Sequence, residues 1–202
     1  MLASKLENYP AWFNKPLPFK GYTYKDYKNW DDDFQVELLD GVPYMMSSPS
    51  VWHQWVSNNL NWQLNNQLKG KKCTPFFELD ARLFYEQDDS DQTVARPDLM
   101  VVCDKAKLKN KVNCQGAPDF IIEIVSKSTS GKDLIDKRNL YEHAGVKEFW
   151  AVTESRIFQY FLEGSAYSEK IHTMASGLKL QVKVLGDVWL DFTEIAEEYG
   201  EN

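Results

Sequence analysis

Two carboxylates, each set in a strongly apolar stretch, are the residues of this sequence best suited to chemistry. Asp98 opens the apolar run at residues 99–103, and Glu123 interrupts a second run at residues 120–125. A carboxylate among apolar neighbours is costly to bury without a cation, hydrogen-bond donors or a metal ion. If the two runs are neighbouring strands, their carboxylates repel each other unless something positive lies between them. A hard cation such as Mg²⁺, or Mn²⁺ as its substitute, meets that need with oxygen ligands.

The same two residues also have purely structural interpretations, and both stay open at this point. Asp98 follows a proline and could cap a turn, while Glu123 could form an ion pair with a nearby basic residue, namely Arg96, Lys137 or Arg138. In the metal-site interpretation, the backbone carbonyl of Ile124 lies beside Glu123 and is the candidate for a further oxygen ligand.

Lys137 is the third candidate, because of its place in a helical pattern. Leu134, Lys137 and Tyr141 are spaced three and four residues apart and therefore share one stripe of a helix. If Leu134 and Tyr141 face a sheet, Lys137 faces it too. A lysine near two carboxylates and a metal can orient an attacking water or stabilise developing phosphate charge. The alternative is a surface lysine paired with Asp133, four residues earlier.

Other polar residues are weaker candidates for the same site. Glu37 could be a third acidic ligand or an exposed strand residue. His53 could touch a phosphate, orient Glu37 or do neither, and Asp80 could be a further acid near the site. Phosphate contacts could come from a basic group that is equally well explained as a solvated charged face, namely Lys127, Lys132 and Arg138.

Composition and motifs exclude several classes of protein. The formal net charge of −7 argues against tight non-specific binding of duplex DNA, although a local basic strip remains compatible with it. No apolar run approaches the roughly 20 residues that span a bilayer, and the first residues show no secretory h-region. The three cysteines form no C-x-x-C pair, so neither a zinc knuckle nor a disulfide framework is expected. We expect the protein to reside in a reducing cytoplasm.

The elements that must position these residues follow from local patterns. Asp40-Gly41 predicts a hairpin with a type I′ turn between residues 35–39 and 42–46. Ser50 is suited to cap an amphipathic helix that ends before Gly70, and residues 76–84 predict a strand. Ser130 and Gly145 delimit a second helix at 132–144. Further β-segments are expected at 99–103, 120–125, 148–152, 157–162, 169–174 and 180–184, with short helices at 23–27 and 193–199.

This order of elements predicts an α/β or α+β fold in which a central sheet carries helices on its faces and continues into a β-rich C-terminal extension. We expect a single domain over residues 1–202. Within it, residues 1–30 form an N-terminal extension, residues 31–153 the core and residues 154–202 the β-rich tail.

The order and spacing of the motifs resemble the Uma2 (DUF820) family of restriction-endonuclease-like proteins, within the PD-(D/E)XK nuclease superfamily. Each motif is weak alone, but together they are specific over about residues 36–152. The motifs are Glu37-Leu38-Leu39-Asp40-Gly41, Ser48-Pro49-Ser50 with His53, Arg96-Pro97-Asp98-Leu99, Pro118 to Ser126, Ser128-Thr129, Asp133 through Lys137 to Tyr141, and Ala144 to Trp150.

The resemblance implies a restriction-endonuclease-like fold, a central mixed sheet flanked by helices, and Mg²⁺-dependent phosphodiester hydrolysis as the ancestral chemistry. Asp98 then matches the Asp of the PD element, Glu123 the second acid, and Glu37 an additional acidic position. The usual lysine of the superfamily would stand at Val125, so the resemblance assigns its role to Lys137.

The resemblance has two further implications, one for a position that departs from the family pattern and one for the partners of the protein. Lys127 stands where relatives commonly have proline, which alters a turn but leaves the carboxylates intact. The tail beyond Glu154 carries little of the signature, and similar proteins use such segments for packing and often for dimerisation. We therefore expect a nucleic-acid partner, most simply DNA, no membrane, and a homodimer.

The expected function is that of a Mg²⁺-dependent endodeoxyribonuclease with Asp98, Glu123, Lys137 and Glu37 as its catalytic set. Two alternatives stay open. One is a nuclease-fold binding or assembly module with little activity, which the negative charge and Val125 favour. The other is a nuclease acting on RNA.

Overall fold

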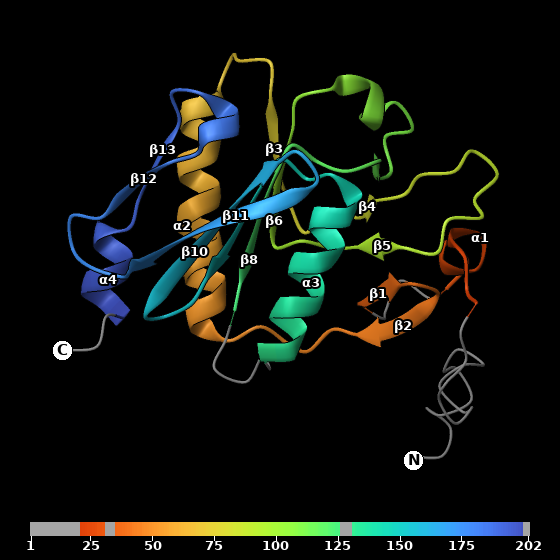
Figure 1. The fold of residues 1–202 in the computed structure, drawn as a ribbon, viewed down its shortest axis with the longest axis horizontal. Helices are drawn as coiled ribbons and strands as arrows, with labels where there is room; N and C mark the ends of the chain where they lie inside the picture. The colour runs from red at the N-terminus through yellow and green to blue at the C-terminus, as the bar shows by residue number, and fades with distance from the viewer. Residues whose placement is uncertain (1–20, 31–34, 126–130, 200–202) are drawn as a thin grey trace.

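A computed structural model of the chain describes residues 21–30, 35–125 and 131–199 (Figure 1). Its centre is a six-stranded sheet in the order β11-β10-β9-β8-β6-β3. Neighbouring strands run antiparallel, apart from the parallel pair β8–β9. The strands are β3 (Thr74–Phe77), β6 (Leu99–Val102), β8 (Phe120–Ile124), β9 (Glu148–Val152), β10 (Arg156–Glu163) and β11 (Ala166–Thr173).

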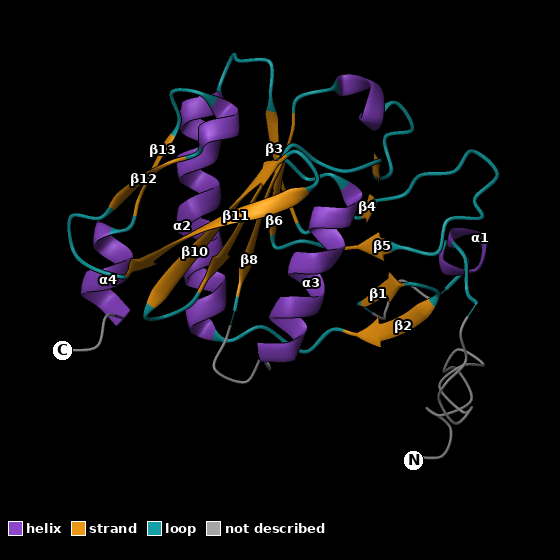
Figure 2. Ribbon diagram, in the orientation of Figure 1, coloured by secondary structure: helices purple, strands orange, loops and turns teal. Residues whose placement is uncertain are grey.

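A second, five-stranded sheet has the order β2-β1-β5-β4-β7 and lies beside α3 on the side away from α2 (Figure 2). It consists of β1 (Val36–Leu39), β2 (Val42–Met45), β4 (Ala81–Arg82), β5 (Val94–Ala95) and β7 (Cys114–Gln115). A third sheet pairs β12 (Lys179–Gln181) with β13 (Trp189–Asp191).

Two long helices lie on opposite sides of β8 (Figure 1). They are α2 (Val51–Leu68) and α3 (Gly131–Ala144). The remaining helical elements are short: α1 (Tyr24–Tyr27), η2 (Lys105–Leu108), η3 (Lys183–Leu185) and α4 (Thr193–Tyr199). No helix of the described residues is both long and apolar enough to cross a membrane.

Alternation along the central strands explains why a helix covers each face of the sheet. Successive side chains of a strand point to opposite faces. Leu99, Val101 and Ile122 pack in one core cluster with α2, while Met100 and Ile121 pack in the other with Tyr141 of α3. Because both faces of β6 and β8 are buried, these strands read as continuous apolar runs. The carboxylate of Glu123 is the exception, and it points to the α3 face.

Local signals predicted several element boundaries correctly. Asp40 and Gly41 have φ values of 49° and 73°, as the type I′ turn between β1 and β2 requires. Ser50 caps α2, because its Oγ accepts a hydrogen bond from the backbone N–H of His53 at 3.2 Å. Gly145, with φ of 82°, follows the end of α3. The predicted cap Ser130 lies outside the described residues.

The C-terminal tail completes the central architecture, as the predicted β-rich extension. β10 and β11 form a hairpin that continues the central sheet beyond β9. Leu190, Phe192 and Ile195 bury against the same core cluster as α2. The tail therefore covers one face of the core and lengthens its sheet.

Two sequence-based expectations were wrong. The strand predicted over 76–84 is two strands in different sheets, β3 and β4, separated at Glu78, whose φ is 47°. A disulfide was not expected, yet Cys73 and Cys103 form one, because Cys73 directly precedes Thr74 and Cys103 directly follows Val102, and Thr74 and Val102 are paired at the ends of β3 and β6. The cysteines therefore give no support to the expected reducing cytoplasm.

Candidate active site

Asp98 and Glu123 lie on the same face of the central sheet because of strand register. β6 and β8 pair antiparallel with Leu99 opposite Ile122 and Met100 opposite Ile121. Extending that register by one residue places Asp98 opposite Glu123. Directly opposed residues of an antiparallel pair project to the same face and lie close together. Both residues are nearly buried, at 6% and 7% exposure.

Glu123 is bound by two side chains of α3. Its Oε1 accepts a hydrogen bond from the Tyr141 hydroxyl at 2.5 Å and from Lys137 Nζ at 2.9 Å. Burial, together with the charges of Asp98 and Glu37, raises the pKa of the Glu123 carboxyl to about 7 against the opposing effect of Lys137. The position therefore holds negative charge at a cost, which a nearby cation would offset.

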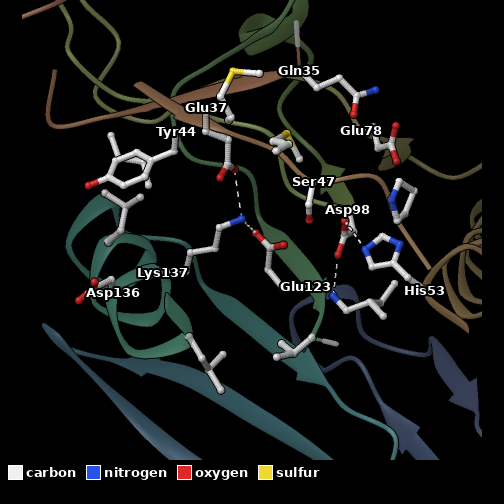
Figure 3. Close-up of a pocket in the computed structure, with 18 of the residues that line it drawn as sticks. Gln35, Glu37, Tyr44, Ser47, His53, Glu78, Asp98, Glu123, Asp136 and Lys137 are labelled. Atoms are coloured by element: carbon white, nitrogen blue, oxygen red, sulfur yellow. Dashed lines mark hydrogen bonds and ion pairs between the residues drawn. The ribbon is translucent and has the colours of Figure 1, made fainter. Parts of the chain in front are cut away.

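Lys137 joins two acids that come from different sheets. Its Nζ lies 2.9 Å from Glu123 Oε1 and 3.1 Å from Glu37 Oε1. Burial alone would lower the pKa of Lys137, but the two carboxylates raise it, so the ammonium stays charged. The predicted helical stripe has the expected consequence, since the buried Tyr141 binds Glu123 and Lys137 reaches the same carboxylate (Figure 3).

Glu37 is held in place by a hydrogen-bond network that includes Asp80. Glu37 Oε1 accepts a hydrogen bond from the backbone N–H of Arg96 at 2.9 Å. The side chain of Arg96 then pairs with Asp80 through Nε at 2.7 Å, and the Tyr27 hydroxyl donates to the other oxygen of Asp80 at 3.0 Å. Asp80 therefore neutralises Arg96 and does not line the pocket. Its contribution is to support the backbone that holds Glu37.

His53 contacts Asp98 and not Glu37. His53 Nε2 lies 3.0 Å from Asp98 Oδ1, and the backbone N–H of Ile124 donates to Asp98 Oδ2 at 2.6 Å. Burial lowers the pKa of His53, but the hydrogen bond and charge of Asp98 raise it by more. Both oxygens of Asp98 are thus held in place, one from α2 and one from β8.

One cavity of about 870 Å³ between the central sheet, α3 and the β1–β2 hairpin is lined by Glu37, His53, Asp98, Glu123 and Lys137 (Figure 3). Its wall is acidic, since six carboxylates line it among the described residues, and Lys137 is the only lysine or arginine there. The acids are Glu37, Asp40, Glu78, Asp98, Glu123 and Asp136.

Of the predicted phosphate contacts, Arg138 is described by the structure and does not line this cavity. Arg138 pairs with Glu142 at 3.0 Å and stacks near the rings of Tyr160 and Tyr167, each 5.7 Å from its guanidinium carbon. Lys127 lies outside the described residues, and so do the side chains of Lys132 and Asp133. The sequence interpretation missed Tyr141 as a member of the site, although its position four residues after Lys137 was the available signal.

The donor chemistry of the cavity fits a divalent cation. Carboxylates are the ligands that Mg²⁺ prefers, and Glu37, Asp98 and Glu123 outnumber the single charge of Lys137. Among the residues that the structure describes, no three acidic, histidine or cysteine side chains are close enough to form a metal shell alone. Mg²⁺ would therefore need the Ile124 carbonyl and water in addition, and Mg²⁺ commonly keeps several waters.

Comparison with known proteins agrees with this architecture. A sequence profile of the Uma2 family, described as "Putative restriction endonuclease", matches residues 24–193. A crystal structure of a "putative nuclease belonging to DUF820" from Anabaena variabilis matches with a TM-score of 0.69 and 15% identity, over 89% of this chain and 98% of that chain. A cryo-electron microscopy structure of a DrdV–DNA complex gives a TM-score of 0.34 and 11% identity, over 56% of this chain and 9% of that chain. No curated protein matches the sequence.

Proposed function

This chain belongs to the Uma2 family and has a restriction-endonuclease-like fold, and from that premise we propose that it is a metal-dependent endonuclease that hydrolyses DNA phosphodiester bonds. The observation that carries the proposal is the convergence of Asp98, Glu123 and Lys137, from three separate elements, on one acidic cavity. Such a group of titratable residues with a perturbed pKa in a cavity is typical of a catalytic site.

Each residue has a defined task in the proposed reaction. Asp98, Glu123 and the Ile124 carbonyl would hold Mg²⁺ or Mn²⁺, with Glu37 nearby, and the bound ion supplies Lewis acidity and lowers the pKa of a coordinated water. Lys137 has three N–H donors, of which two bind Glu37 and Glu123, so the third can hold a phosphate oxygen or the attacking water.

The surrounding residues preorganise this set. His53 and the backbone N–H of Ile124 each bind one oxygen of Asp98, which fixes the plane of that carboxylate. Tyr141 does the same for Glu123. Groups held by such hydrogen bonds do not need to reorient when charge develops on the phosphate.

The proposal is tested by cleavage of plasmid and single-stranded DNA with Mg²⁺, with Mn²⁺ and with a chelator. We expect the wild-type protein to cut only when metal is present. Asp98→Asn and Glu123→Gln remove one charge at nearly constant shape and should each lower the rate about 100-fold or more. Asp88→Asn makes the same type of change at an exposed carboxylate that does not line the cavity, and it should retain full activity. Equal rates for wild type and Asp98→Asn would remove the assignment.

A second candidate is a binding or assembly module that keeps the fold and hydrolyses little. It is favoured by Val125, which stands at the usual lysine position, and by the net charge of −7. Calorimetric titration with Mn²⁺ separates the two. Metal uptake that Asp98→Asn abolishes supports the nuclease, whereas no uptake by a stable, DNA-inactive protein supports the module. Replacing DNA by RNA in the cleavage assay tests whether RNA is the substrate.

We also propose that the protein forms a homodimer through β11. This strand ends the central sheet in the described part of the chain, and Ile171 on it is 54% exposed. Exposed sheet edges favour pairing with another strand. Light scattering after size-exclusion chromatography should show a dimer for the wild type and a monomer for Ile171→Lys. A wild-type monomer contradicts this assembly.

A further inference from the structure

Tyr44 of β2 is an exposed aromatic residue at the acidic cavity. Its cross-strand partner in the β1–β2 hairpin is Glu37. Directly opposed residues project to the same face of a sheet with their Cβ atoms about 5 Å apart. Tyr44 therefore points toward the same cavity as Glu37, and Figure 3 shows its ring at one end, with Lys137 and Glu123 between it and His53.

The exposure of this ring distinguishes it from Tyr141, the other tyrosine of the site. Tyr44 is 51% exposed, whereas Tyr141, which donates a hydrogen bond to Glu123, is fully buried. A large, half-exposed ring beside a polar cavity has a free face on which a flat ligand can stack. Nucleobases are such ligands, and stacking on tyrosine tolerates any base because every base has a π-face.

The cavity wall has an apolar part that suits a base as well as an acidic part that suits a metal-bound phosphate. Its apolar residues include partly buried side chains that pack on the α3 core cluster, among them Leu39, Phe84, Leu134 and Leu140. The volume of about 870 Å³ is in the range of cavities that enclose small organic ligands. A nucleotide combines both chemistries and is of that size class.

Charge argues for a single strand over a duplex. Proteins that bind duplex DNA neutralise many phosphates with lysine and arginine. Here Lys137 is the only such residue among the described residues of the cavity wall, against six carboxylates, and the whole chain carries −7. The described part of this cavity wall lacks the basic residues needed to neutralise the two phosphate backbones of a duplex. Its affinity for nucleic acid can come from base stacking instead, and stacking of this kind requires an unpaired base.

We infer that Tyr44 is a stacking site for an unpaired nucleobase next to the scissile phosphate, so that single-stranded nucleic acid is the preferred substrate of this cavity. The inference rests on the proposed function for the scissile phosphate, while the binding site itself does not depend on hydrolysis. The 2′-hydroxyl is outside the stacking contact, so the site accepts the base chemistry that DNA and RNA share.

Fluorescence anisotropy with short labelled oligonucleotides, in a chelator and then with Mn²⁺, tests the inference. Single-stranded DNA, single-stranded RNA and the DNA duplex are compared for wild type, Tyr44→Ala, Tyr44→Phe and Trp62→Ala. We expect wild type to prefer single strands. Tyr44→Ala should weaken their binding about 5- to 150-fold, which corresponds to the usual effect of removing one stacking aromatic. Tyr44→Phe keeps the ring and should keep the affinity.

Trp62→Ala is the matched control, because Trp62 is also an exposed aromatic, at 67%, but lies on α2 outside the cavity wall. It should bind like the wild type. Unchanged single-strand binding by Tyr44→Ala, a preference of the wild type for duplex, or no binding by the wild type would each overturn the inference.

The cleavage assay makes the two proposals distinguishable. If the protein cuts DNA in a metal-dependent way and Tyr44→Ala binds and cuts like the wild type, the nuclease proposal is supported and the stacking site is contradicted. If single strands bind in a Tyr44-dependent way but no metal-dependent cutting occurs, the stacking site is supported and the nuclease proposal is contradicted.

Discussion

Two of the charge clusters in the described part of this protein differ in how their charges are balanced. The first is the Arg82 cluster, which consists of Arg82, Asp91, Asp89 and Lys28. The side chain of Arg82 is 3% exposed and pairs with Asp91 and, at 2.9 Å, with Asp89, to which Lys28 also binds at 2.7 Å. Two positive charges thus meet two negative ones, and the guanidinium also lies 3.8 Å from the ring centre of Tyr24.

The second is the cavity cluster, which consists of Glu37, Asp98, Glu123 and Lys137. Here three carboxylates meet one ammonium, and the group faces an open cavity. In the Arg82 cluster, burial lowers the pKa of Arg82, but Asp91 and Asp89 raise it by more, so the guanidinium stays charged. In the cavity cluster, burial and then the charges of Asp98 and Glu37 raise the pKa of Glu123 to about 7, although Lys137 opposes them.

The difference teaches how to separate structural from functional ion pairs in one molecule. A buried cluster whose charges and hydrogen bonds are matched stabilises the arrangement that it joins, here α1 against the segment between β4 and β5. A buried cluster with surplus charge beside a cavity leaves room for a ligand of the opposite sign. Mutation and metal addition should therefore affect the two clusters in opposite ways.

The largest expected effect is on the Arg82 cluster. Arg82→Met leaves Asp91 buried without its partner, and removing one member of a buried ion pair typically costs about 3–5 kcal/mol of unfolding free energy. Urea denaturation followed by circular dichroism measures that loss. Arg138→Met, which removes a more exposed arginine paired with Glu142, is the control and should lose less. A loss below about 1 kcal/mol for Arg82→Met would contradict the comparison.

An intermediate effect is expected from metal addition at the cavity cluster. At a Mn²⁺ concentration of about 100 times Kd, binding to the folded state adds about 2.7 kcal/mol. For a chain of this length, that corresponds to a rise in Tm of roughly 5–10 °C. Differential scanning fluorimetry should show this rise for wild type and for Lys28→Met, and its loss in Asp98→Asn. A wild-type Tm that does not change when Mn²⁺ is added would contradict the proposed difference between the two clusters.

The smallest effect is expected at the outer edge of the Arg82 cluster. Lys28 is 43% exposed, and ion pairs of exposed lysines contribute about 0–1 kcal/mol. Lys28→Met should therefore change the urea midpoint little, although it removes a 2.7 Å contact with Asp89. A cost equal to that of Arg82→Met would show that the cluster depends on overall charge balance more than on burial.

Parts of the fold could be predicted because local rules decide them. The Asp40-Gly41 turn, the Ser50 cap and the continuous apolar run at residues 99–102 each depend on neighbours within a few positions. The strand over 76–84 failed because Glu78 adopts positive φ and sends the chain to another sheet. Nothing in the local alternation signals that change.

Pairings between distant residues could not be assigned from the sequence. Arg96, Lys137 and Arg138 were equivalent partners for Glu123, and only the packing of α3 on the sheet selected Lys137. Arg138 is the next residue, but one position along a helix turns the side chain by about 100°, which directs it to Glu142. The Cys73–Cys103 disulfide likewise joins residues 30 positions apart through strand pairing.

The sequence by itself determined the apolar strands, the acids within them, the helix that carries Lys137 and the membership of the family. Only the tertiary structure decided that Asp98 and Glu123 share a face, that Lys137 also reaches Glu37, and that Tyr44 stands open beside them. The physical reason is that residue type and periodicity depend on near neighbours. Convergence of side chains depends on strand register and helix rotation, which are set by the packing of the whole core.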